Sequence, residues 1–303
     1  MHKKNAWLGF FTLFGSMLLY AFSGVVVVGL ATAFGIIGQV TFRALAALVL
    51  TIVWLAITGA RYKLSKKYET KWLWVDLLCR PIYNVCFVYA VLAIGPTSAL
   101  FYLFSSKVIV GGVIRVFFGG KKPLALPDYI SYLMVFIGML VYSFPITSAL
   151  SLGIVFALSS GTFEAIKSRA MEKLSVTDSK DKAVFSLYEF TSLALITVVM
   201  VLFAGQSFMI ASITWAVWKI LGFSAVIAVG ALGLELTGFA NFDSDLGNAV
   251  LASEMGFAGL LNFLILGTEM TGFQIVGSAL LVLSLATVAL ASYMRNKQNK
   301  ILS

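Results

Sequence analysis

The stretch SALFYLFSSKVIVGGVIRVFFGGKK, residues 98–122, decides how this sequence folds. It is a long apolar run with one ionisable residue, Lys107, near its middle and glycines close to its end. A second stretch, NAVLASEMGFAGLLNFLILGTEMT at residues 248–271, has the same design around Glu254. Aligning the glycines that close the two stretches places Glu254 opposite Ser106. A repeated apolar helix with a central charge suggests a membrane transporter built from two repeats.

The composition supports a helical membrane protein. Apolar residues make up 60% of the chain and charged residues 12%, with a mean hydropathy of +0.97. A soluble domain carries about 25% charged residues. Apolar runs of about 20 residues, each long enough to cross a bilayer, recur almost throughout. Runs of this length without strict alternation exclude an outer-membrane barrel. The sequence therefore predicts an all-α integral membrane protein.

Breaker residues divide the apolar sequence into ten predicted transmembrane helices. Gly59, Gly95-Pro96, Gly205 and Gly267 are examples of such joins. The predicted helices cover roughly 6–30, 36–58, 72–94, 97–117, 126–147, 149–168, 183–205, 216–238, 245–266 and 271–293.

Basic residues set the orientation of these helices. They gather in alternate loops, at Lys3 and Lys4, at Arg61 to Lys71, at Lys121 and Lys122, at Lys167 to Lys182, and at Arg295 to Lys300. By the positive-inside rule, both termini are cytoplasmic, in a cytoplasmic-type (inner) membrane. This pattern also explains the net charge of +9 without nucleic acid as a partner. Five spans per half, an odd number, make residues 1–147 and 148–303 two inverted five-helix repeats.

Neither a metal site nor a cofactor is expected. Cys79 and Cys86 lie two turns apart within one apolar helix, and His2 is the only histidine. These residues provide no ligand cluster and no Ser-His-Asp triad inside the membrane. The N-terminal apolar run, 6–30, is longer than the apolar region of a signal peptide, so we expect a retained first helix.

Charged residues inside the predicted spans are the candidate functional residues. A charge at the bilayer centre costs about 2.5–3.5 kcal/mol, so such residues pair with one another or line a wet cavity. The candidates are Arg43, Arg80, Lys107, Glu189 and Glu254.

Arg80 lies on a polar stripe with Asp76 and Asn84, at i, i+4 spacing, and Tyr83 is adjacent. One interpretation makes this stripe a wall of the substrate cavity, with Arg80 contacting an anionic group. The alternative is that Asp76 simply neutralises Arg80 within the helix.

Lys107 lies in mid-helix, where its ammonium group can bind a carboxylate or phosphate, or pair with Glu254 when the site is empty. Tyr102 and Ser106 on the neighbouring face are candidate hydrogen-bonding partners of the substrate. Burial at this depth disfavours an ionised carboxyl group, which makes Glu254 the candidate proton-coupling residue. The alternative is a fixed Lys107–Glu254 bridge that locks the two repeats together.

The remaining charges have simpler interpretations. Arg43 and Glu189 enter from opposite sides of the membrane, so we expect different depths and structural roles. Glu164 is a candidate cavity residue, or else an exit residue salt-bridged to Lys167 at i+3.

The chain resembles the EamA-type transporters of the drug/metabolite transporter (DMT) superfamily. The residues that carry the resemblance are Phe42-Arg43-Ala44-Leu45, and Glu254 followed by Leu266-Gly267-Thr268-Glu269. The first half departs from the family pattern, with Ser106 in place of a glutamate and Phe118-Gly119-Gly120 in place of Leu-Gly-Glu. The resemblance implies ten helices in two inverted five-helix repeats. The family handles amino acids, nucleotide-like metabolites, cations and drugs, so it does not identify a substrate.

The expected function is secondary active transport, not an enzymatic reaction. The excess of cationic residues in the predicted cavity favours a small substrate with an anionic or amphoteric group, such as an amino acid. Because the sequence has no P-loop, we expect a proton or counter-substrate gradient to drive alternating access. The alternative is a membrane-embedded lipid- or prenyl-modifying enzyme that uses Asp243 and Asp245 on the cytoplasmic side. Those aspartates are also explained as a polar turn that caps a helix.

Overall fold

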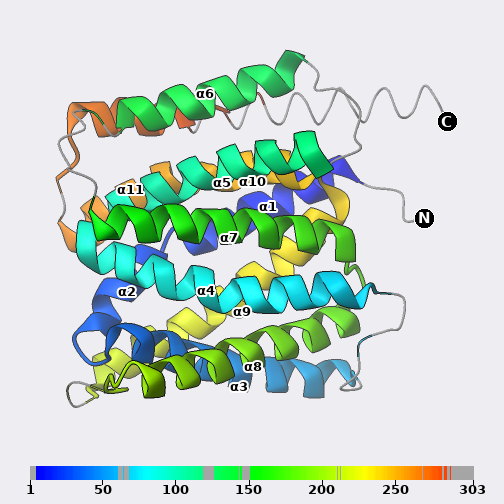
Figure 1. Cartoon of the computed structure of the whole chain (residues 1–303), viewed down its shortest axis with the longest axis vertical. Coiled ribbons are helices and arrows are strands. Elements are labelled where there is room, and N and C mark those ends of the chain that lie inside the picture. Colours follow the sequence, from blue (N-terminus) through cyan, green and yellow to red (C-terminus); the bar gives the residue numbers. More distant parts are fainter. Residues whose placement is uncertain are drawn as a thin grey trace.

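The computed structural model describes residues 5–60, 64, 68–118, 126–142, 144, 151–209, 211, 213–267, 269–281, 283, 284 and 287. The described residues form helices and the segments that connect them (Figure 1). The helices are α1 (Ala6–Tyr20), α2 (Ser23–Ala31), α3 (Ile36–Thr58), α4 (Thr70–Ile94), α5 (Pro96–Phe118), α6 (Leu126–Tyr142), α7 (Leu152–Leu174), α8 (Ser179–Phe203), α9 (Trp215–Asn241), α10 (Ser244–Ala252) and α11 (Glu254–Leu266), followed by a helix at Gly272–Leu281.

The predicted helical membrane class is confirmed. Within the described residues, seven helical segments are long and apolar enough to cross a membrane. They include α1 with α2, and most of α10 with α11, each taken as one span. Among the other helices, α6 and the Gly272–Leu281 helix are shorter in their apolar parts, and α7 carries five charged residues.

Glycines end helices where the sequence predicts breaks. Gly59 and Gly267 lie directly after α3 and α11, with φ angles of 59° and 66°. Glycine adopts this left-handed backbone conformation at the end of a helix without steric clash, because it has no Cβ atom. Several features of the sequence prediction lie outside the described residues. They are Gly119, Gly120, Thr268, the boundary between residues 147 and 148, and the basic terminal segments.

The helices form layers that bring distant parts of the chain together (Figure 1). Helices α3 and α8 lie against each other at one edge of the molecule. Next come α4, which packs on α7, and α5, which packs on the other side of α7. At the far edge, α6 packs against the Gly272–Leu281 helix, where Gly277 meets the backbone of Tyr142.

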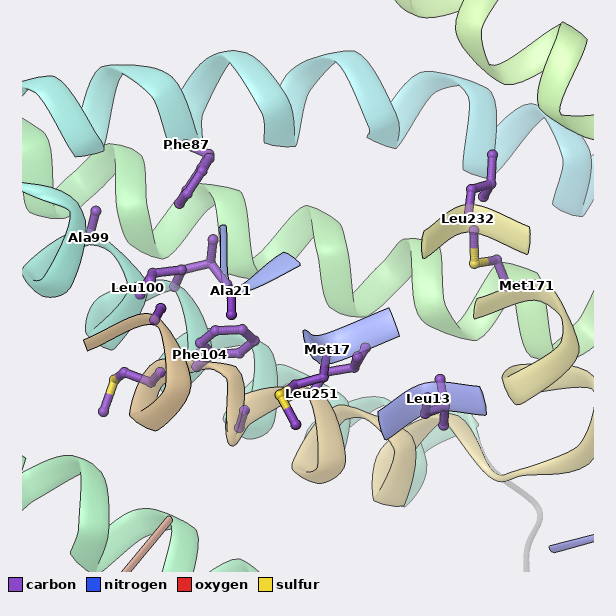
Figure 2. Close-up of a cluster of buried hydrophobic side chains, with 14 of the residues drawn as sticks. Leu13, Met17, Ala21, Phe87, Ala99, Leu100, Phe104, Met171, Leu232 and Leu251 are labelled. Atoms are coloured by element: carbon purple, nitrogen blue, oxygen red, sulfur yellow. The ribbon is translucent and has the colours of Figure 1, made fainter. Parts of the chain in front are cut away.

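The outside of the molecule is apolar, as a bilayer requires. Ile57, Leu195 and Phe203 are 79%, 62% and 90% exposed. Many other large apolar side chains are exposed as well, among them Leu133, Trp215 and Leu264. Inside, a hydrophobic cluster joins both halves of the chain, and Figure 2 shows Met17 of α1, Phe104 of α5 and Leu251 of α10 turned into it.

Two of the predicted continuous spans are broken. The first divides into α1 and α2 around Ala21 and Phe22, where the Phe22 amide bonds back three residues rather than four. The ninth divides into α10 and α11 at Ser253, whose amide bonds to the carbonyl of Val250 and whose hydroxyl donates to the carbonyl of Leu281. Hydropathy alone does not reveal such breaks, because the residues on both sides are apolar.

Candidate functional site

Two adjoining pockets open inside the helical layers. The larger, which we call the arginine pocket, has about 520 Å³ of empty space. The smaller, the carboxylate pocket, has about 300 Å³. Four residues line both pockets: Tyr20, Ser23, Tyr83 and Phe87. The arginine pocket adds Val40, Arg43, Ala44, Arg80, Asn84, Phe190, Leu193, Ile227 and Ala228, and the carboxylate pocket adds Leu100, Leu103, Phe104, Glu164 and Glu254.

A buried ion pair beside the carboxylate pocket joins α5 to α7. The Nζ atom of Lys107 donates to Oε1 of Glu164 over 2.6 Å, and Lys107 is fully buried. Lys107 therefore pairs with Glu164 and not with Glu254, the partner that the sequence had left open as an alternative. Lys107 meets Glu164 because α5 and α7 lie very close together at Gly161, where a Cβ atom would overlap Leu103 and Ser106. Glu164, one turn further along α7, consequently faces Lys107.

A second buried pair joins α7 to α9. Lys167 Nζ donates to Oε2 of Glu235 over 3.1 Å, and the Tyr20 hydroxyl donates to the same oxygen over 3.1 Å. The i+3 spacing had suggested that Lys167 pairs with Glu164. In the structure, Lys167 pairs with Glu235 instead. Lys167 was expected among the cytoplasmic loop charges, but it is 1% exposed within α7. Glu235 was missed, although a glutamate inside a predicted span was itself a signal.

A third buried pair joins α4 to α8. Arg80 Nη1 lies 2.8 Å from Oε1 of Glu189, in a geometry that is not aligned as a hydrogen bond. The Arg80 guanidinium also lies over the rings of Tyr83 and Phe190. Asp76 does not neutralise Arg80 by an ion pair. Its carboxyl oxygens are buried and have no hydrogen-bond partner among the described residues.

Two charged residues of the pockets stand outside these pairs. Arg43 lines the arginine pocket, and its Nη1 atom is shielded from solvent without an acceptor among the described residues. Glu254 lines the carboxylate pocket at the start of α11 and is 5% exposed. No ion pair joins Glu254 to any residue in the described part of the chain.

Five of the eight predicted substrate-binding residues line the pockets. They are Arg80, Tyr83, Asn84, Glu164 and Glu254. The other three, Tyr102, Ser106 and Lys107, line neither pocket. Ser106 donates to the carbonyl of Leu103, and Tyr102 packs edge-to-face on Phe101. The part that each residue plays in binding stays a prediction.

The aspartates of the alternative enzyme interpretation lie at the start of α10. Asp243 directly precedes that helix, and the side chain of Asp245 lies outside the described residues. Next to Asp243, Ser244 donates to Glu172, which also binds Arg169 over 2.6 Å. This contact ties the turn to the end of α7.

The fold and its interior charges define a class: a multi-pass helical membrane protein with a polar cavity between its helices. Protein-family models give no match to the sequence, and curated proteins give none. Among solved structures, the chain is similar to one described as "Crystal structure of protein", with a TM-score of 0.74 and 12% identity. That match covers 94% of this chain and 98% of the other. At such an identity the likeness shows a common fold.

Proposed function

We propose that the protein is a secondary active transporter of a small polar metabolite with an anionic or amphoteric group, such as an amino acid. The observation that carries the proposal is the pair of adjoining pockets. One contains Arg43 and Arg80, and the other contains Glu164 and Glu254. Polar pockets between membrane helices are where secondary transporters bind their substrates. Ionisable residues in such places are functional candidates because leaving them in lipid is costly.

The helix contacts support an inverted-repeat architecture of ten spans, with repeats at 1–147 and 148–303. The third span of the first half, α4, packs on the first span of the second half, α7. In the mirrored contact, α9 packs on α1 and α2. Likewise α5 packs on α7, while α10 and α11 pack on α1, and the second spans α3 and α8 pack on each other. This exchange of partners is what a twofold relation between two five-span units produces.

The broken spans support the same proposal. The break between α1 and α2 lies between Tyr20 and Ser23, which line both pockets. The break between α10 and α11 lies directly before Glu254, which lines the carboxylate pocket. Discontinuous helices at the interface of two repeats are a recurring feature of transporter binding sites, because their free backbone groups contact the substrate or coupling ion.

The energy source we propose is an ion or substrate gradient. The sequence contains no P-loop for nucleotide binding, so alternating access is driven by protons or by a counter-substrate. Glu254 is the proposed proton carrier, because it combines a pocket position with the absence of an ion pair among the described residues. In this proposal the two repeats rock against each other in a cytoplasmic-type membrane, with both termini cytoplasmic.

Transport by purified protein in proteoliposomes tests the proposal. Counterflow of a panel of radiolabelled L-amino acids is measured with and without an imposed pH gradient. We expect protein-dependent counterflow of at least one amino acid, and an about tenfold or larger loss of gradient-driven uptake in Glu254→Gln. Glu269→Gln, on an exposed residue, is the matched control. Flux no faster than in protein-free liposomes for every amino acid would contradict the amino-acid assignment.

A further inference from the structure

Most interior cations among the described residues already pair with a carboxylate. Arg80 pairs with Glu189 at 2.8 Å, Lys107 with Glu164 at 2.6 Å, and Lys167 with Glu235 at 3.1 Å. Breaking such a buried pair leaves an uncompensated charge, so these cations are poorly placed to exchange their carboxylates for a substrate. Arg80 and Lys107 are the cations to which the sequence had pointed.

Arg43 is different. It lines the arginine pocket from α3, and no ion pair joins it to the described residues. Its Nη1 atom is buried without a hydrogen-bond acceptor in the described part of the chain. The side-chain oxygen and nitrogen of Gln39, one turn earlier, are likewise buried without a hydrogen-bond partner there. A buried donor without an acceptor costs about 1–3 kcal/mol, and more when it is charged. One nitrogen of the Arg43 guanidinium is therefore buried without an acceptor among the described residues, in a side chain that lines the pocket.

The surroundings of Arg43 favour an anion with an apolar body. Arg80 lines the same pocket but is already paired with Glu189, so Arg43 is the cation of this pocket without an ion-pair partner among the described residues. Apolar residues of α8 and α9, among them Leu193, Ile227 and Ala228, line the same pocket. A guanidinium presents donors in a planar fork that matches the two oxygens of a carboxylate.

We propose that Arg43 binds the carboxylate of the substrate. This inference rests on the proposed transport function and assigns the anion-recognising residue of the same cavity. Arg80 stays paired with Glu189, and the apolar side chains of the pocket accommodate the substrate's hydrocarbon part. Arg43 thereby acts as the specificity-determining residue that distinguishes a carboxylate from a neutral amide.

Binding of three related probes tests the assignment. The probes are L-leucine, L-leucinamide, which lacks the carboxylate, and 4-methylpentanoate, which lacks the amine. Their affinities are measured by calorimetry with the full-length protein in lipid nanodiscs. We expect Arg43→Gln to weaken L-leucine and 4-methylpentanoate by about tenfold or more and to leave L-leucinamide unchanged, because a charge-assisted contact is lost. Arg43→Lys, which keeps the charge but not the fork, should fall between. Lys71→Gln, at an exposed lysine, is the control.

The outcomes separate this inference from the proposed function. Unchanged affinities in Arg43→Gln overturn the role of Arg43 while transport of amphoteric substrates stands. Equal weakening of all three probes also overturns it, because Arg43 then shapes the pocket instead of reading the carboxylate. A wild-type protein that binds none of the probes contradicts the substrate class and the assignment together. The melting temperature of each variant is measured to detect misfolding. We expect values near wild type, because Arg43 has no ion-pair partner among the described residues.

Discussion

Lys107 of α5 and Glu164 of α7 form a buried ion pair of 2.6 Å between residues 57 positions apart in the sequence. The pair crosses the proposed boundary between the two repeats, as does the pair of Arg80 with Glu189. A movement of one repeat against the other would have to preserve these contacts or break them. They are therefore the places where stability and transport can be separated by mutation.

Removing one partner of the Lys107–Glu164 pair should destabilise the protein more than removing both. Lys107→Met leaves a buried carboxylate without its cation, which we expect to cost about 3–5 kcal/mol. Adding Glu164→Gln to Lys107→Met should restore most of that loss. The measurement is the free energy of unfolding by denaturant titration in mixed micelles. A double variant as unstable as the single one would show that the pair is not the source of the effect.

Asp76 and Glu189 should respond differently to the loss of charge. Asp76→Asn removes a buried carboxyl group that has no hydrogen-bond partner among the described residues, so the free energy of unfolding should fall by no more than about 0.5 kcal/mol, or rise. Glu189→Gln strands Arg80 and should cost about 3–5 kcal/mol. Thermal and denaturant unfolding of both variants checks this contrast. Equal losses would mean that Asp76 shares in neutralising Arg80.

Gly161 should tolerate no larger residue. A Cβ atom at this position would overlap the carbonyl oxygen of Leu103 and the hydroxyl of Ser106, because α5 and α7 lie very close together there. Gly161→Ala should therefore destabilise the protein by about 1–3 kcal/mol or more. Gly112→Ala, on α5 with open space around the added atom, should remain close to wild type. Both melting temperatures are compared. Equal behaviour of the two variants would contradict the close helix approach.

The two ends of α8 should be accessible from opposite sides of the membrane. The helix spans Ser179–Phe203, 25 residues, so it is about 37 Å long, more than the hydrocarbon thickness of about 30 Å. In a background with Cys79 and Cys86 replaced by alanine, a membrane-impermeant maleimide should label Ser207→Cys in intact cells. Lys180→Cys should be labelled only after permeabilisation. The reverse pattern would overturn the proposed orientation.

Local sequence signals accounted for most of the helices. Hydropathy and breakers such as Gly59 and Gly267 located them because both act within a few residues. The free-energy cost of placing a charged side chain in lipid can be judged without knowing its partner. Charged residues within the predicted spans therefore pointed to Arg80, Glu164 and Glu254. The breaks at Phe22 and Ser253 were not predicted, because tertiary contacts such as that of Ser253 with Leu281 accompany them.

The sequence alone determined that this chain is an apolar, all-helical membrane protein with ionisable residues in its interior. Only the tertiary structure decided which of those residues meet. Glu164 lies three positions before Lys167 on α7, yet it binds Lys107 of α5, while Lys167 binds Glu235 of α9. A helix surface offers each side chain several neighbours at similar distances, and the rotation and close packing of whole helices select one of them. That selection also left Arg43 facing the pocket without an ion-pair partner among the described residues.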